Sequence, residues 1–153
     1  MKITGTHELK ASTEVIWQML MDSSVLEKIT PGIEKLELKA EDLYNASSQV
    51  RVGPVRGGFE GELALRNKVD GVSCLLVIDQ KSKMGNVAAE IGIHLEPADT
   101  GNTQVRYTGE ARMSGMLART GQRIMSGVVS TLSKQFFQAL EKEVEAASTG
   151  KLP

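Results

Sequence analysis

The sequence is poor in the residues that most often carry chemistry or form cross-links. Its 153 residues include one cysteine, Cys74, and two histidines, His7 and His94, and only 4% of them are aromatic. A single cysteine excludes an internal disulfide and is typical of a protein from a reducing compartment. Two histidines and one cysteine in separate segments are too few for a metal site without added carboxylates. We therefore expect no disulfide, no metal and no cofactor.

Long apolar runs and an excess of one charge are also missing. No segment approaches 18 consecutive apolar residues, and the first ten residues have no apolar stretch like that of a signal peptide. The 18 Lys and Arg nearly balance the 19 Asp and Glu, which argues against a nucleic-acid-binding protein. These features predict a cytoplasmic protein with one domain at residues 1–147 and a disordered tail at 148–153.

None of the short motifs of common enzyme or nucleotide sites occurs in the sequence. There is no HExxH, CxxC or GxSxG sequence and no Walker-type loop. Cys74 has no sequence sign of activation, so we interpret it as a small core residue. His94 falls opposite the apolar phase of its strand and should face solvent, whereas His7 shares the phase of Ile3 and Leu9 and belongs in the core or at its rim. We expect no catalytic residue.

What the sequence does contain is one long proline-free segment with a helical period, from Gly115 to about Ala147. At about 1.5 Å per residue, a helix of this length would cross a whole small domain. Its small residues leave room either for a close neighbouring backbone or for a ligand, and the segment alone does not decide between them. The apolar residues of its predicted inner stripe are Leu117, Ala118, Gly121, Met125, Val128, Val129, Leu132, Phe136, Ala139 and Leu140.

The rest of the chain alternates apolar and polar residues with the two-residue period of strands. Two short helices are predicted after the first strand, over residues 12–20 and 22–29. The order predicts an α+β helix-grip fold, in which a curved seven-stranded antiparallel sheet and two short helices wrap around the long C-terminal helix. The glycine pair at 57–58 predicts a bend before the fourth strand. The predicted strands are residues 2–9, 33–43, 44–55, 59–66, 72–83, 87–95 and 103–113.

The inward phases of these strands and of the long helix predict an apolar interior with few polar groups. Only Tyr107, Ser48 and His7 would add polar contacts there. An apolar cavity with a few orienting groups is typical of a small-molecule site. The residues predicted to bind a ligand are Phe59, Leu63, Leu76, Ile91, Tyr107, Met113, Leu117, Gly121, Ile124, Val128 and Leu132.

Four stretches of the chain form a distinctive combination. They are STEVIW at 12–17, ITPGIEKL at 29–36, VGPV at 52–55 with FEG at 59–61, and the glycine-spaced final helix that runs from GMLA at 115–118 to QFF at 135–137. Together they resemble the carbon monoxide dehydrogenase G-subunit family, a branch of the START-like superfamily that also includes the birch-pollen-allergen-like proteins. The resemblance covers residues 1 to about 145.

The resemblance implies a non-catalytic accessory protein of a molybdenum hydroxylase of the carbon monoxide dehydrogenase type. Such a protein would hold a lipophilic molecule, a lipid or an isoprenoid quinone, and would connect the enzyme with the inner face of the membrane. Members that attach to membranes extend well past the final helix, whereas this sequence stops at Pro153. We therefore do not expect its own C-terminus to bring it to a membrane.

Two other functions stay open at this point. START-like relatives include cyclases and hydrolases, so the same cavity could belong to an enzyme, for which only His7 and Tyr107 offer acid–base groups. Alternatively, the chain is an interaction module without a ligand. Its strand 72–83 is apolar on both faces around residues 74–78. That strand would then pair two copies of the chain as a homodimer.

Overall fold

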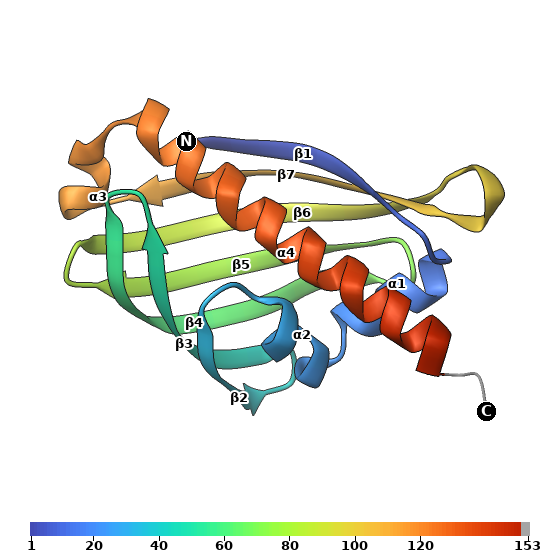
Figure 1. Ribbon diagram of the computed structural model, residues 1–153. Coiled ribbons are helices and arrows are strands. Elements are labelled where there is room, and N and C mark those ends of the chain that lie inside the picture. Colours follow the sequence, from blue (N-terminus) through green and yellow to red (C-terminus); the bar gives the residue numbers. More distant parts are fainter. Residues whose placement is uncertain (151–153) are drawn as a thin grey trace.

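The computed structural model describes the backbone of residues 1–150 and the side chains of residues 1–147. One antiparallel sheet curves around a long helix (Figure 1), and its strand order is β1-β7-β6-β5-β4-β3-β2. This arrangement confirms the predicted helix-grip fold. The strands are β1 (Lys2–Leu9), β2 (Ile33–Ala40), β3 (Leu43–Val52), β4 (Val55–Val69), β5 (Ser73–Ser82), β6 (Gly85–Pro97) and β7 (Thr103–Met113).

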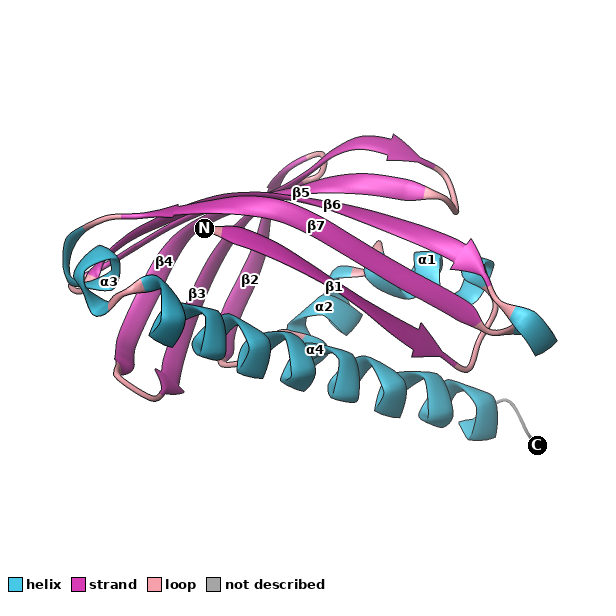
Figure 2. Cartoon of the chain, turned by 90° about the horizontal axis from the view of Figure 1, so that it is seen from above, coloured by secondary structure: helices cyan, strands magenta, loops and turns pink. Residues whose placement is uncertain are grey.

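Connections between strands are short, with one exception. From β2 to β7 each strand pairs with the next one along the chain, whereas β1 pairs with β7, from Lys2 opposite Glu110 to Leu9 opposite Thr103. The helices α1 (Thr13–Leu20) and α2 (Ser23–Ile29) join the two edge strands, and the short 3-10 helix η1 (Asp99–Gly101) joins β6 to β7. Because of this order, the two short helices close one end of the curved sheet (Figure 2).

Both short helices begin at side-chain caps that the sequence supplies. The amide of Val15 donates to Ser12 Oγ over 3.3 Å, and the amide of Ser24 donates to Asp22 Oδ1 over 2.9 Å. Each bond satisfies one of the free amide groups in a first helical turn. The two caps therefore fix where the helices start.

The C-terminal helix is broken where the sequence predicts one continuous element. Gly121, with φ 101° and ψ 145°, separates α3 (Gly115–Thr120) from α4 (Gln122–Gly150). A positive φ of this size is reached readily only by glycine. The prediction of a single helix from 115 to 147 is therefore wrong at its first two turns. Of the predicted tail, residues 148–150 continue the backbone of α4, and 151–153 lie outside the described residues.

Strand β4 is longer than predicted, since it begins at Val55 rather than Phe59. Gly57 and Gly58 stay in register opposite Val50 and Gln49, so they continue the strand pairing. The tip of the β3–β4 hairpin is only the pair Gly53-Pro54. As a result the hairpin projects as a long ribbon beside the start of α4 (Figure 1).

Buried clusters hold α4 against the sheet at each end, and a smaller third one, formed by Ile3, Ala89 and Ala111, packs against Val129. The almost fully buried side chains at the α1–α2 end are Leu9, Ile16, Ile29 and Leu140. At the α3 end, Leu117 is buried to the same degree. Between the clusters many apolar side chains are only partly buried. Over the described residues, α4 included, no helix combines the length and apolar character needed to cross a bilayer.

Candidate functional site

A cavity in two compartments lies between the sheet and α4. The compartments measure about 280 and 290 Å³. They adjoin along a shared wall of seven residues, which we call the waist. Together the compartments reach the size range of small-molecule sites, about 300–1,000 Å³. The waist residues are Thr30, Pro31, Leu63, Ile78, Ile91, Leu132 and Ser133.

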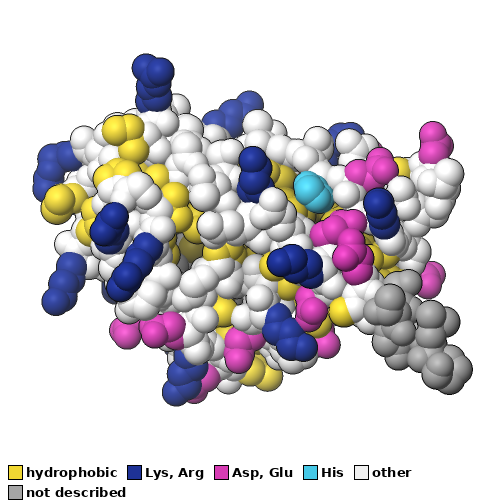
Figure 3. All heavy atoms as spheres, viewed as in Figure 1, with side chains coloured by type: hydrophobic (Ala, Val, Ile, Leu, Met, Phe, Trp, Pro, Cys, Tyr) yellow, Lys and Arg dark blue, Asp and Glu magenta, His cyan; other side chains and the backbone are white. Residues whose placement is uncertain are grey.

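The two compartments extend toward opposite ends of α4. The first runs toward α1 and α2, where Tyr44, Cys74, Tyr107 and Phe137 line it. The second runs toward α3 and the β3–β4 hairpin. Figure 3 shows hydrophobic side chains at the floor of the gap between α4 and this hairpin. The second compartment is lined there by Val50, Val55, Phe59, Leu117, Met125 and Val128.

Hydroxyl groups provide most of the cavity's polar content. Among the described residues, none forms a hydrogen bond with the hydroxyl of Tyr44, Tyr107, Ser48 or Ser133, although all four line a compartment. The Thr30 hydroxyl donates to the carbonyl of Leu26 over 2.6 Å. The four hydroxyls without protein partners can therefore donate to oxygen atoms of a bound molecule.

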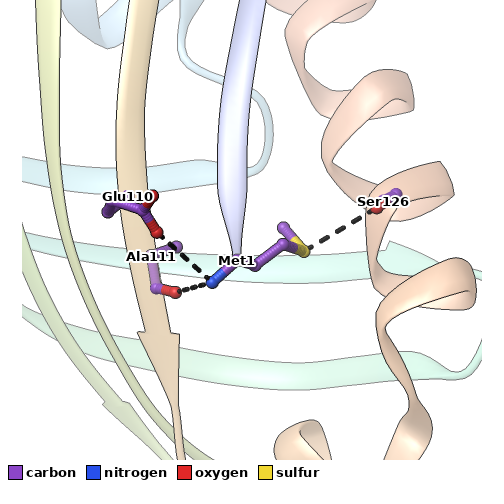
Figure 4. Close-up of polar contacts among 4 residues, drawn as sticks. All are labelled: Met1, Glu110, Ala111 and Ser126. Carbon is purple, nitrogen blue, oxygen red and sulfur yellow. Dashed lines mark hydrogen bonds and ion pairs between the residues drawn. The ribbon is translucent and has the colours of Figure 1, made fainter.

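No charged side chain occurs among the described residues that line the two compartments. One ammonium group lies close by, at the N-terminus of Met1, which lines the second compartment. It donates to the carbonyl of Ala111 over 2.7 Å and lies 3.7 Å from Glu110 Oε2, while the Met1 sulfur accepts from the Ser126 hydroxyl on α4 (Figure 4). This ammonium is already engaged, so an anionic ligand would find no free cation.

An aromatic stack bounds the first compartment. Phe137 lies between His7, at 4.8 Å between ring centroids, and Tyr107, at 5.5 Å. His7 therefore packs at the rim, as predicted, and does not line the cavity. Cys74 lies in the wall nearby, where burial raises the pKa of its thiol. A thiol held in its neutral form is a poor nucleophile.

Nine of the eleven predicted ligand-binding residues line the cavity. Gly121 and Ile124 do not: Gly121 is exposed with open space around its Cα, and Ile124 is 49% exposed. Gly121 lies at the break itself, and in the first turn of α4 the inward position belongs to Met125, so its neighbour Ile124 faces outward. The nine that line the cavity are Phe59, Leu63, Leu76, Ile91, Tyr107, Met113, Leu117, Val128 and Leu132.

Several lining residues are absent from the sequence prediction. The polarity of Ser133 favours the outer face of the helix, yet this residue belongs to the waist. Its spacing carries a signal, because Val129, Ser133 and Phe137 follow one another at four-residue steps and therefore share one face of α4. Thr30 and Pro31 belong to the loop after α2, where no period indicates the direction of a side chain.

The remaining candidates for a chemical role do not form a second site among the described residues. His94 is exposed, as predicted from its strand phase. No group of three or more His, Cys, Asp or Glu side chains able to hold a metal ion occurs among the described residues. A wider hollow of about 830 Å³ on the outer face of the sheet is lined largely by charged residues. Lys35 and Glu37 form an ion pair within it over 2.6 Å.

Comparison with known structures places the fold in a class. The chain superposes on a START superfamily protein from Mycobacterium smegmatis with a TM-score of 0.77 at 12% identity, over 95% of this chain and 98% of the other. The Zhui aromatase/cyclase from Streptomyces sp. R1128 superposes with a TM-score of 0.67 at 16% identity, over 95% and 92%. The protein therefore has the START-like fold, with its cavity between sheet and helix.

Sequence comparison narrows the class to a family. The profile of the carbon monoxide dehydrogenase G-subunit family (CoxG) matches residues 5–145, and the chain belongs to this family. A conserved protein from Geobacillus kaustophilus is 33% identical, covers 96% of this chain and 97% of its own, and superposes with a TM-score of 0.93. A comparison with curated protein sequences found no significant match.

Proposed function

We propose that the protein binds one neutral, elongated, apolar molecule in its two-compartment cavity. The observation that carries this proposal is the lining itself, which combines apolar side chains and free hydroxyls with no charged side chain among the described residues. Each square ångström of apolar surface that a ligand buries contributes about 25 cal/mol, so a few hundred square ångströms provide several kcal/mol before the cost of association.

The lining also favours an uncharged ligand over a fatty-acid anion. An ionised carboxylate in this cavity would lose its water without gaining a cation, which is strongly unfavourable. Carbonyl oxygens, in contrast, could accept from Tyr107, Ser133 or Ser48. An isoprenoid quinone has such oxygens on its ring and an apolar tail, and the adjoining compartments offer separate space to each. We therefore favour a quinone as the ligand, with a neutral lipid as the alternative within the same class.

The protein would act without catalysing a reaction. Its ionisable lining side chains are Tyr44, Cys74 and Tyr107, and none of them is paired with a base among the described residues. The cyclase named among the structural neighbours shares the fold at 16% identity, which supports no shared activity. Family membership supports the role of an accessory protein for a molybdenum enzyme of the carbon monoxide dehydrogenase type. In that role it would exchange the ligand between the enzyme and the inner face of the membrane.

Native mass spectrometry and titration with an uncharged environment-sensitive probe test this function. We expect a co-purifying neutral lipid or quinone, and we expect an isoprenoid quinone to displace the probe more strongly than an ionised fatty acid of similar length. Equal displacement by the fatty acid would contradict the preference for a neutral ligand. A protein that carries no lipid and binds neither probe nor quinone would refute the binding function.

Two leucine variants provide a matched comparison. Leu132 belongs to the waist, whereas Leu38 on β2 is 68% exposed. Leu132→Gln should weaken quinone binding at least about fivefold, because an unpaired amide in an apolar site costs roughly 1–3 kcal/mol. Leu38→Gln makes the same chemical change on the surface and should leave quinone affinity unchanged.

A further inference from the structure

Three segments at one end of the molecule carry Lys and Arg but no Asp or Glu, and we call them the basic end. They are residues 51–57 at the β3–β4 tip, 82–86 at the β5–β6 turn, and 112–127 from the end of β7 into α4. These 28 residues include six Lys or Arg and no Asp or Glu, although acids outnumber bases in the whole chain. The six cations are Arg51, Arg56, Lys83, Arg112, Arg119 and Arg123.

The cations of the basic end have no carboxylate partners among the described residues. Ion pairs elsewhere engage Lys28, Lys35, Lys39, Lys68 and Arg106. At the basic end, Arg51 even lies directly opposite Arg56 across the strand pair. Like charges at opposed positions of a sheet repel each other. An anionic partner would offset this repulsion.

Exposed apolar side chains lie among these cations. Met116 on α3 and Ile124 on α4 are 54% and 49% exposed, and their chain neighbours Leu117 and Met125 line the second compartment. Figure 3 shows hydrophobic side chains and Lys and Arg gathered at the left end, over α3 and the β3–β4 hairpin of Figure 1. The acidic side chains in this view lie along the lower edge and over the right half.

The three segments are bound together through Met84, so they form one surface. The amide of Leu117 donates to the Met84 carbonyl over 3.0 Å, and the amide of Arg56 approaches the Met84 sulfur at 3.4 Å. Ser114 donates its amide to the Asn86 carbonyl over 3.0 Å, and its hydroxyl accepts from the Asn86 amide over 2.9 Å. Hairpin tip, turn and α3 therefore approach a partner together.

We propose that the basic end docks onto an anionic lipid bilayer, with the arginines at the headgroup phosphates and with Met116 and Ile124 inserted between the headgroups. Cations around a small apolar centre are typical of surfaces that bind the membrane interface. We favour a bilayer over an acidic protein surface because Met116 and Ile124 are isolated apolar side chains with Arg119 and Arg123 beside them, which suits the headgroup boundary, whereas protein interfaces bury a contiguous apolar core. This docking rests on the proposed exchange with the membrane but not on the identity of the ligand, since it depends on the outer surface only. It places the second compartment next to the bilayer.

Co-sedimentation with lipid vesicles tests the proposal. The wild-type protein should bind vesicles of phosphatidylcholine mixed with phosphatidylglycerol and should not bind pure phosphatidylcholine, and added salt should weaken the binding because it screens exposed charges. Arg119→Glu with Arg123→Glu should lower the affinity at least about 20-fold, since each cation near an anionic surface contributes roughly a fivefold gain. The double change Lys10→Glu with Lys142→Glu reverses two charges outside the basic end and should have little effect.

The apolar contribution is tested separately. Met116→Ser with Ile124→Ser should remove the binding that persists at high salt, whereas Leu38→Ser with Val72→Ser, which changes exposed apolar residues elsewhere, should preserve it. Circular dichroism and thermal melting check that each variant is folded. The proposal is overturned if wild-type protein ignores anionic vesicles, or if both charge-reversal pairs reduce binding equally. Failure of vesicle binding would remove the exchange with the membrane and leave quinone binding in solution intact, so the two failures can be told apart.

Discussion

Filling the waist of the cavity should stabilise the protein and abolish ligand binding at the same time. Ser133 on α4 lines both compartments, and its hydroxyl has no hydrogen-bond partner among the described residues. In Ser133→Leu, three carbon groups replace the hydroxyl. At about 0.8 kcal/mol per buried methylene, the substitution should stabilise the fold by about 2 kcal/mol.

The volumes support this expectation. At about 24 cal/mol per Å³ of void filled, 2 kcal/mol corresponds to roughly 80–100 Å³. Each compartment has about 280 or 290 Å³, so a leucine side chain has room without displacing its neighbours. For a domain of this size, a gain of about 2 kcal/mol should raise Tm by about 4–8 °C. Ligand affinity should fall strongly, because the added side chain occupies the passage between the compartments.

Thermal melting and probe displacement on two variants provide the measurement. The control is Ser130→Leu, since Ser130 lies on the exposed side of the same helix. It should change neither Tm nor quinone affinity much. If the waist were closely packed, Ser133→Leu would instead destabilise the protein by about 1–3 kcal/mol through overpacking. That result, with unchanged ligand binding, would refute the existence of the two-compartment cavity.

Two further predictions concern ionisable groups. Hydrogen bonds from the Ser24 hydroxyl and amide lower the pKa of Asp22 in the folded state. This cap therefore stabilises the protein at pH values above the usual carboxyl pKa, and its contribution is lost as the pH falls. Asp22→Ala should lower Tm at neutral pH, and the difference in Tm from wild type should narrow on acidification. Burial raises the pKa of the Cys74 thiol, so alkylation of Cys74 should be slow near neutral pH and slower still with quinone bound. Mass spectrometry of the labelled protein measures the rate. Equal labelling with and without quinone would contradict the position of Cys74 in the cavity wall.

The architecture can be predicted from the sequence because repeating patterns record it directly. Alternation in the strands and the four-residue steps of α4 specify which side chains are buried, and this is enough for nine lining residues. The patterns cannot specify a backbone angle at a single residue. Gly121 is compatible with a helix in sequence, and the break becomes visible only in the structure, where α3 packs against the β5–β6 turn. Ser133 is missed for another reason: in a cavity, a hydroxyl can face inward without a protein partner.

The pairing of β1 with β7 has a consequence for synthesis of the chain. All other strand pairs join neighbours in sequence and can form as hairpins while the chain emerges, whereas Lys2–Leu9 must wait for Thr103–Met113. Until then, the first strand has no partner, and its apolar residues Ile3 and Leu9 lie open to chaperones or to other nascent chains. Closing a contact across some hundred residues is entropically slow. The strand that comes first in this sheet's chain order is thus among the last to join it.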